Sequence, residues 1–207
     1  MDKTSKLFDV WAKSGRSEDM EKGHGTTVNQ FLDKLSITKN FRFLDIGCGN
    51  GWVVRKMSQH SFCIKAIGID KSKMMVKNAK SKILSKKENY FVTELETWKT
   101  KEKFDIIFSM ESLYYSVPME PALEKVFKLL KKGGIFYCGT DFYSDNTLTT
   151  RWIKDMNIPM DLRSEKEWKK MFREIGFSTR SKHVTDPKNK SKWKREFGTL
   201  FVIGRKP

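Results

Sequence analysis

The architecture of this chain is set by the segment Phe43-Leu44-Asp45-Ile46-Gly47-Cys48-Gly49-Asn50-Gly51, which is followed by Ile67-Gly68-Ile69-Asp70. An apolar strand runs into a glycine-spaced turn, a helix follows, and a second apolar strand ends on a carboxylate. The glycines let the backbone turn tightly and approach a ligand without a Cβ in the way. Asp70 stands where a strand–helix–strand unit places an acceptor for ribose hydroxyls. The pattern therefore predicts a site for a nucleoside cofactor.

The spacing of the glycines separates the candidate cofactors. The dinucleotide fingerprint G-x-G-x-x-G has glycine at its sixth position, whereas here that position is Trp52 and the glycine falls one residue earlier, at Gly51. Asp45 stands two residues before the first glycine, where its charge would oppose a pyrophosphate but favour an ammonium or sulfonium group. A dinucleotide-binding domain and a chance glycine-rich turn are the alternatives, and both fit this combination less well.

The segment from Asp45 to Gly51 resembles the D-x-G-x-G-x-G turn of class I S-adenosylmethionine-dependent methyltransferases. The resemblance covers roughly residues 41–205 and is closest to the small-molecule branch that includes methyltransferase type 11-like enzymes. It implies an α/β fold with a seven-stranded, mostly parallel, doubly wound sheet, an antiparallel C-terminal hairpin and helices on both faces. It also implies S-adenosylmethionine as the cofactor.

Length and composition are those of one globular domain. The chain has 207 residues, of which 38% are hydrophobic, enough for one core and few for two. We expect a single domain over residues 1–207, with a helical N-terminal lid over 1–40 and a Rossmann-like core over 41–207. Its three cysteines lack metal-ligand spacing, so we expect no metal site. Without a signal-peptide pattern or an apolar run of about 20 residues, the sequence predicts a cytoplasmic protein with no membrane insertion.

Alternating apolar runs and helical periodicity predict the order of elements. Residues 14–25 are polar and glycine-bearing, which predicts a loop or lid between two N-terminal helices. Gly133-Gly134 is predicted to end a helix over residues 120–130, and Ser164 with Glu167 forms a predicted capping box. Strands are expected at residues 41–46, 66–70, 90–92, 104–109 and 135–139, with a final pair near 177–184 and 199–203. Helices are expected after Gly51 and, rich in lysine, after Asp70.

Ligands of open α/β sheets lie beyond the carboxyl ends of the strands. The resemblance implies that Asp70 accepts ribose hydroxyls, although it could equally cap the next helix. Met74 would lie against the adenine, or simply in the core. Glu94 would accept from the adenine amino group, with Glu96 as the competing register and a solvated loop carboxylate as the alternative. The predicted cofactor-binding residues are Asp45, Gly47, Cys48, Gly49, Asp70, Lys71, Met74, Glu94, Leu95 and Ser109.

The segment Ser109-Met110-Glu111-Ser112-Leu113-Tyr114-Tyr115 follows the fourth strand, which in the family lies beside the transferable methyl group. It lacks the N/D-P-P-Y/F tetrapeptide of enzymes that methylate exocyclic amines and has tyrosine where the small-molecule branch often has histidine. Glu111 is the first candidate for a general base. Tyr115 is a candidate for orienting the acceptor, with a core role as the alternative. His24, predicted to lie in a fixed turn between two glycines, is the third candidate, with ordinary surface as the alternative.

The formal net charge is +16, which leaves the acceptor open. A small organic acceptor fits the motif, and the methyl would pass to its O, N or C atom. The basic surface makes RNA, or a protein, the alternative acceptor, although a solvated lysine-rich surface explains the charge more simply. A non-catalytic cofactor-binding module is a third reading, because the glycine turn reports binding rather than turnover. The oligomeric state is not encoded in any recognisable pattern.

Overall fold

The computed structural model describes residues 2–207 and contains one seven-stranded sheet of order β3-β2-β1-β4-β5-β7-β6. Its neighbours pair in parallel except along β7, which is antiparallel to both β5 and β6. The strands are β1 Phe41–Ile46, β2 Cys63–Asp70, β3 Glu88–Val92, β4 Phe104–Met110, β5 Leu130–Thr140, β6 Ser178–Val184 and β7 Thr199–Arg205. The predicted fold class, with its antiparallel C-terminal hairpin, is confirmed.

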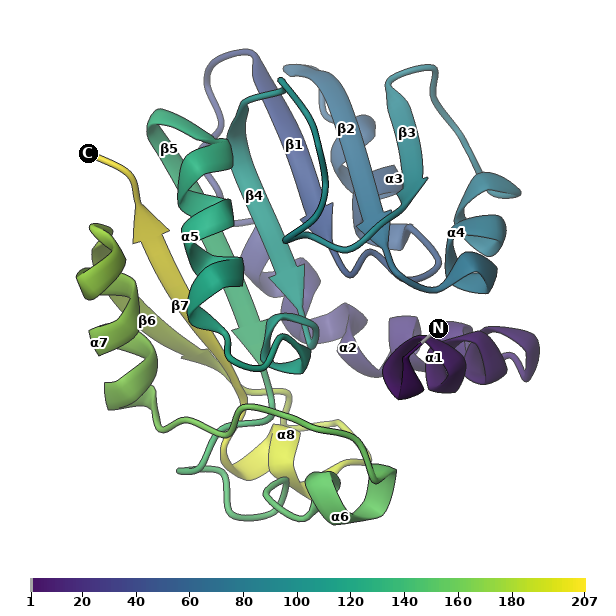
Figure 1. Cartoon of the computed structure of the whole chain (residues 1–207), viewed down its shortest axis with the longest axis vertical. Helices are drawn as coiled ribbons and strands as arrows, with labels where there is room; N and C mark the ends of the chain where they lie inside the picture. Colours follow the sequence, from purple (N-terminus) through teal and green to yellow (C-terminus); the bar gives the residue numbers. More distant parts are fainter. Residues whose placement is uncertain (1) are drawn as a thin grey trace.

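Helices cover both faces of the sheet (Figure 1). One core cluster joins α5 and α7 to the sheet, and the other joins α2, α3 and α4 to the opposite face. Strand β4 lies between these layers, and Phe104, Ile107 and Phe108 on it are fully buried, as expected for a parallel strand covered on both sides. The helices are α1 Lys3–Lys13, α2 Arg16–Leu32, α3 Trp52–Ser58, α4 Lys73–Lys80, α5 Glu120–Leu129, α6 Trp152–Met156, α7 Glu165–Ile175 and α8 Lys192–Glu196, with a 3₁₀ turn η1 at Leu113–Tyr115.

The loop predicted over residues 14–25 is wrong. Gly15, with φ +79°, makes the break after α1, and α2 then begins at Arg16 and runs through this segment. Each helical glycine costs about 1 kcal/mol relative to alanine, but burial of Val28, Phe31 and Leu32 against the sheet offsets that cost. Tertiary packing thus overrides the local propensity on which the prediction relied.

The helix end predicted at Gly133-Gly134 is also misplaced. Helix α5 stops at Leu129, the next residue is already extended, and both glycines lie within β5. A Cβ on Gly134 would lie 2.9 Å from the carbonyl oxygen of Lys131. The glycines therefore allow a tight irregularity in the strand and do not cap a helix. The capping box of Ser164 and Glu167 at the start of α7 is confirmed.

The N-terminal helix α1 packs against α4, where the Asp9 carboxylate accepts hydrogen bonds from the Ser72 hydroxyl at 2.6 Å and the Met74 amide at 3.1 Å. Helix α1 therefore lies beside the carboxyl ends of the strands, while the C-terminal part of α2 packs on a face of the sheet (Figure 1). Within residues 2–207, no helix combines the length and apolar character needed to cross a bilayer.

Two glycines of the turn after β1 provide a matched test of the packing. Both have positive φ, so alanine at either should cost about 1–2 kcal/mol in backbone strain. A Cβ on Gly51 would also lie 2.7 Å from the Tyr90 ring and 2.9 Å from the Ala79 Cβ, whereas one on Gly49 would meet nothing within 4 Å. We expect Gly51→Ala to lower the free energy of unfolding in urea by a further ~1–3 kcal/mol compared with Gly49→Ala. Equal losses would contradict this packing.

Candidate functional site

A cavity of about 440 Å³ lies at the carboxyl ends of β1, β2 and β4. Helices α1 and α2 contribute Phe8, Met20 and His24 to its wall, so the N-terminal segment forms part of the site. This is the position at which open α/β sheets bind ligands, beside the reversal of strand order next to β1. The cavity is therefore the candidate functional site.

The glycine turn brings backbone directly to the cavity. The amides of Gly47 and Cys48 both donate to the carbonyl of Ile69, at 2.9 and 3.0 Å, which ties the turn to the end of β2. Gly47 has φ +68°, and a Cβ there would lie 1.9 Å from the Ser112 hydroxyl oxygen. Only glycine fits this close approach, and the result is a backbone surface open to a ligand.

Two carboxylates, the buried Asp45 and the half-buried Asp70, lie at the ends of the neighbouring strands. Asp70 accepts hydrogen bonds from the amides of Gly49, at 2.9 Å, and Ser72, at 2.8 Å, so it is fixed in place. Asp45 is 3% exposed, and no side chain within residues 2–207 forms an ion pair or hydrogen bond with its carboxylate. Burial, reinforced by the charge of Asp70, raises the pKa of Asp45 well above its usual range. A ligand cation at this point would stabilise the ionised carboxylate of Asp45.

The other predicted cofactor residues lie around the same cavity, with two exceptions. Met74 does not line the cavity, whereas Met75, on the buried face of α4, does. Ser109 is fully buried and does not line the cavity, although Phe108 and Met110 beside it do. Glu94 and Glu96 both lie on the cavity wall, so both registers bring a carboxylate to the site. The predicted residues on the wall are Asp45, Gly47, Cys48, Gly49, Asp70, Lys71, Glu94 and Leu95.

Glu111 and Tyr115 lie at the wall beyond the end of β4. Glu111 has φ +52°, an uncommon conformation for a residue with a side chain. Its carboxylate accepts from the Tyr114 hydroxyl at 2.9 Å and from the Asp141 amide. Burial and the nearby Asp141 charge raise the pKa of Glu111 to about 8. A carboxyl group with a pKa in this range can take part in general acid–base chemistry near neutral pH.

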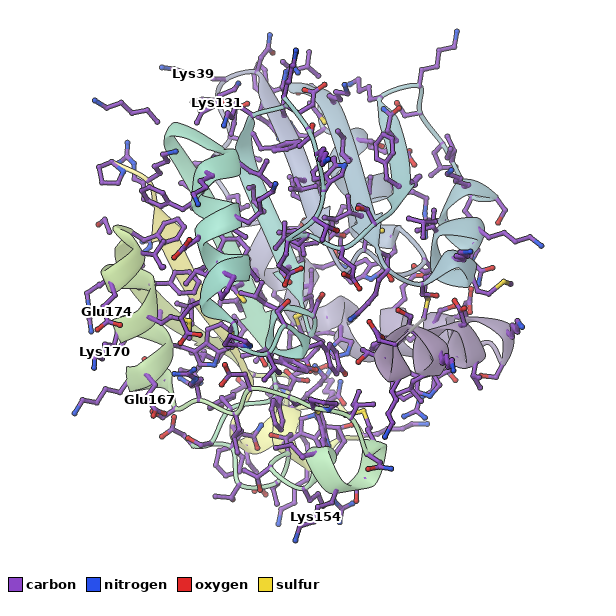
Figure 2. All side chains as sticks on the ribbon, in the orientation of Figure 1. Lys39, Lys131, Lys154, Glu167, Lys170 and Glu174 are labelled. Atoms are coloured by element: carbon purple, nitrogen blue, oxygen red, sulfur yellow. The ribbon has the colours of Figure 1, made fainter. Side chains whose placement is uncertain are left out.

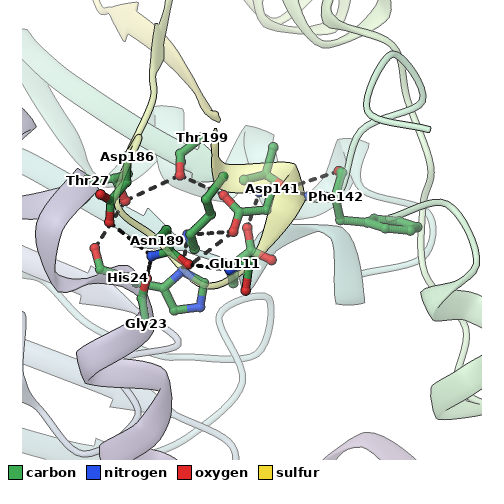
Figure 3. A network of polar contacts seen from close by, with 12 residues as sticks. Gly23, His24, Thr27, Glu111, Asp141, Phe142, Asp186, Asn189 and Thr199 are labelled. Carbon is green, nitrogen blue, oxygen red and sulfur yellow. Dashed lines mark hydrogen bonds and ion pairs between the residues drawn. The ribbon is translucent and has the colours of Figure 1, made fainter. Parts of the chain in front are cut away.

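His24 lies on α2 rather than in the predicted glycine turn, and a polar network surrounds it (Figure 3). Its Nδ1 is 3.0 Å from the ammonium nitrogen of Lys194 and 3.8 Å from a carboxylate oxygen of Asp141. Burial, followed by the charge of Lys194, lowers the pKa of His24 to about 4. His24 is therefore neutral at pH 7. The structure brings all three catalytic candidates, Glu111, Tyr115 and His24, to one cavity.

Sequence reasoning missed several residues of the site. Lys194 is 3% exposed and forms an ion pair with Asp141 at 2.6 Å, yet in the sequence it is one lysine of a basic segment. Asn50 is buried and donates to the Glu21 carboxylate at 2.8 Å. The spacing of Glu21 and His24, three residues apart on one helix, could have signalled a shared face, but only if the segment had been recognised as helical.

Comparison with known proteins places the fold in a family. A family model described as a methyltransferase domain matches residues 17–182. Among curated proteins, ubiquinone biosynthesis O-methyltransferase from Pelagibacter ubique is 36% identical over 104 residues, covering 49% of this chain and 42% of the relative. The chain spans about half the length, or less, of the curated relatives it matches first.

Solved structures agree with the sheet topology. The chain described as the putative methyltransferase in a complex with the Haloferax volcanii Trm112 methyltransferase activator superposes with a TM-score of 0.90, at 26% identity over 97% of each chain. Magnesium protoporphyrin IX methyltransferase from Synechocystis PCC 6803, solved with bound S-adenosylhomocysteine, has a TM-score of 0.71 at 16% identity over 100% of each chain, which shows the shared fold alone.

The family model covers the glycine turn, both strand-end carboxylates and the segment that carries Glu111. The chain belongs to the methyltransferase domain family, and its predicted resemblance to class I S-adenosylmethionine-dependent methyltransferases is confirmed.

Proposed function

We propose that this protein transfers a methyl group from S-adenosylmethionine to an O, N or C nucleophile of a small organic acceptor. The observation that carries the proposal is the cavity itself, where the glycine turn, the carboxylates of Asp45 and Asp70 and the Glu111 carboxyl with its raised pKa meet. The chemistry supplied by the cofactor is an electrophilic methyl group on a sulfonium centre. The protein must then hold the acceptor in line and take its proton.

The residues around the turn fit this cofactor. Asp70 is held by two backbone amides with lone pairs left over for ribose hydroxyls. The unpaired carboxylate of Asp45 would be paired by the cationic amino-acid end. Leu95 would cover the adenine, and Glu94 or Glu96 would accept from its amino group. A dinucleotide would instead bring its pyrophosphate to Asp45, which the charge disfavours.

Glu111 is the residue that we assign to proton transfer. It faces the cavity, and its two oxygens accept from Tyr114 and from the Asp141 backbone, so its orientation is fixed. The Tyr115 hydroxyl lies 3.5 Å from that of Tyr114 and its ring packs edge-on against Phe8 of α1. We assign Tyr115 to shaping the acceptor side of the cavity rather than to proton transfer, because burial raises its pKa above the ordinary tyrosine value.

Charge inside and outside the cavity favours a small acceptor over RNA. The wall is acidic although the protein is basic, and an acidic wall repels phosphate. Figure 2 shows Lys39 and Lys131 at one end of the molecule, Lys154 at the other and Lys170 on a third side, so the lysines are dispersed rather than gathered at the cavity. The charged residues of the wall are Glu21, Asp45, Asp70, Glu94, Glu96 and Glu111, with Lys71.

A protein partner is a second proposal, because the chain aligns end to end with the partner of the Haloferax volcanii Trm112 activator. We propose that this chain also binds a small activator protein of that type. Strand β3 is an edge strand, and Phe91 and Val92 on it are 44% and 46% exposed. Ile83 and Leu84, just before it, are 46% and 71% exposed. Exposed apolar side chains beside an unpaired strand edge are typical of a protein-binding surface.

The substitution Asp45→Asn separates cofactor binding from stability. Binding of S-adenosylmethionine should weaken tenfold or more, about 1.4 kcal/mol, because a cation loses its partner. The folded-state pKa of Asp45 is raised, so ionisation above the unfolded-state pKa of about 4 destabilises the fold. The variant should therefore be at least as stable as wild type at pH 7, and this advantage should vanish below pH ~4.

Calorimetric titration and urea unfolding measure the two effects. The matched control is Asp105→Asn, whose carboxylate bonds the Arg42 amide and the Lys131 ammonium at the opposite end of β4. It should leave cofactor affinity unchanged. An unaltered affinity in Asp45→Asn would contradict the assignment.

The pH dependence of methyl transfer tests Glu111. Protonated Glu111 cannot accept a proton, so kcat/KM should fall about tenfold per pH unit below pH 8 and level off above it. Glu111→Gln should lower kcat about 10²–10⁴-fold and abolish this dependence, whereas Glu124→Gln, on an exposed face of α5, should change neither.

Acceptors would be screened among small acids, amines, phenols and RNA. Full activity in Glu111→Gln would overturn the assignment, and cofactor binding without transfer to any acceptor would favour a binding module.

Co-expression with the Haloferax volcanii Trm112 activator tests the partner proposal. A one-to-one complex should purify with wild type and with Val10→Asp, an exposed position on α1, but not with Leu84→Asp. Absence of any complex, or its survival in Leu84→Asp, would argue against this surface.

A further inference from the structure

We infer that Lys194 is a positioning residue of the site: its buried ammonium group holds His24 in the tautomer that carries hydrogen on Nε2, so that His24 offers the bound acceptor a hydrogen-bond donor rather than a base. The inference rests on the proposed function for the acceptor, but the state of His24 can be measured without it.

The geometry places a complete ion pair behind the imidazole. The Lys194 ammonium lies 2.6 Å from Asp141 Oδ2 and 3.0 Å from His24 Nδ1, and the Lys194 and Asp141 side chains are 3% and 0% exposed. His24 is 18% exposed and lines the cavity. A buried lysine is costly unless it is paired, and here Asp141 provides the pairing charge.

The donors and acceptors around His24 then determine which tautomer of its imidazole is present. An ammonium group only donates, so Nδ1 must accept, and a neutral imidazole that accepts at Nδ1 carries its hydrogen on Nε2. Asp141 Oδ1 is already occupied by the Thr199 hydroxyl at 2.6 Å. With Nδ1 engaged, Nε2 is the ring nitrogen left for a bound molecule. Proton transfer is thereby left to Glu111.

The charges that face His24 come from two other elements. Lys194 approaches from α8 and Asp141 from the end of β5, and the lysine is the nearer of the two. Asp141 also donates its backbone amide to Glu111 (Figure 3). The Lys194–Asp141 pair therefore lies behind both His24 and Glu111. Burial lowers the pKa of His24, and the charge of Lys194 lowers it further. The carboxylate of Asp141 acts in the opposite direction, but its effect is smaller because it lies farther from the imidazole than the ammonium group does.

Contacts around this pair join segments far apart in the sequence. The hydroxyl oxygens of Thr27 on α2 and Thr199 lie 3.3 Å apart, and the Asn189 side-chain amide donates to the Gly23 carbonyl at 3.3 Å. The loop before α8 thus holds the cavity-lining part of α2 in place. Removal of the Lys194 ammonium group would disturb the part of the cavity wall formed by α2, where we place the acceptor. It would leave the glycine turn and Asp70 unchanged.

Nitrogen-detected NMR of the wild-type protein tests the tautomer directly. The chain has three histidines, and His24→Gln assigns the signal of interest. We expect His24 to remain neutral, with hydrogen on Nε2, from pH 8 down to pH 5. An Nδ1-bound hydrogen, or titration near the ordinary histidine pKa, would overturn the inference even if no methyl acceptor were known.

Variants at position 194 test the positioning role. In Lys194→Met, Asp141 becomes the only charge facing His24, so the His24 pKa should rise by one unit or more and kcat should fall tenfold or more. S-adenosylmethionine affinity should change less than threefold. Lys194→Arg should retain the neutral His24, and Lys192→Met, whose side chain is 61% exposed, should behave as wild type. An unchanged His24 pKa and kcat in Lys194→Met would contradict the role, and if that variant fails to fold, the wild-type tautomer and Lys194→Arg decide.

Discussion

The structure depends on the hydrogen bonds that tie the turn after β1 to the end of β2. The amides of Gly47 and Cys48 share the carbonyl of Ile69, and the amide of Gly49 donates to Asp70. These bonds hold a bare backbone surface beside a fixed carboxylate, and only glycine can adopt the conformation and permit the approach. The rest of the sheet serves to hold β1 and β2 in register, with their carboxyl ends level.

Burial of charge determines how the site works. Asp45 has no partner in the described residues, Glu111 has a raised pKa, and Lys194 is paired deep in the protein with Asp141. Each arrangement costs stability. A chain optimised for stability alone would replace these groups with apolar side chains, so their concentration around one cavity indicates function. The cavity wall is acidic although the protein is basic, because the lysines are distributed over the outside. Negative charge therefore acts at the site and positive charge acts at the surface.

Much of the fold could be predicted because its signals are local. Residues 106–108 are consecutive apolar residues inside the predicted fourth strand, and the capping box at Ser164 contains its own start signal. The failures have a common cause. Residues 16–25 are helical because Val28, Phe31 and Leu32 farther along the same helix pack against the sheet. Gly133 and Gly134 accommodate an irregularity within a strand. Local propensity contains no information about either tertiary contact. The Lys194–Asp141–His24 cluster joins three segments more than fifty residues apart, a juxtaposition that only the tertiary fold creates.

The central claim is that the glycine turn and its two carboxylates bind S-adenosylmethionine. Its most direct test is a calorimetric titration of the wild-type protein with S-adenosylmethionine, S-adenosylhomocysteine and NAD. We predict saturable one-to-one binding of the first two in the micromolar range and none of NAD, because the position of Asp45 disfavours a pyrophosphate. Failure to bind either sulfur nucleoside, or tighter binding of NAD, would contradict the account and leave the turn as a feature of the fold alone.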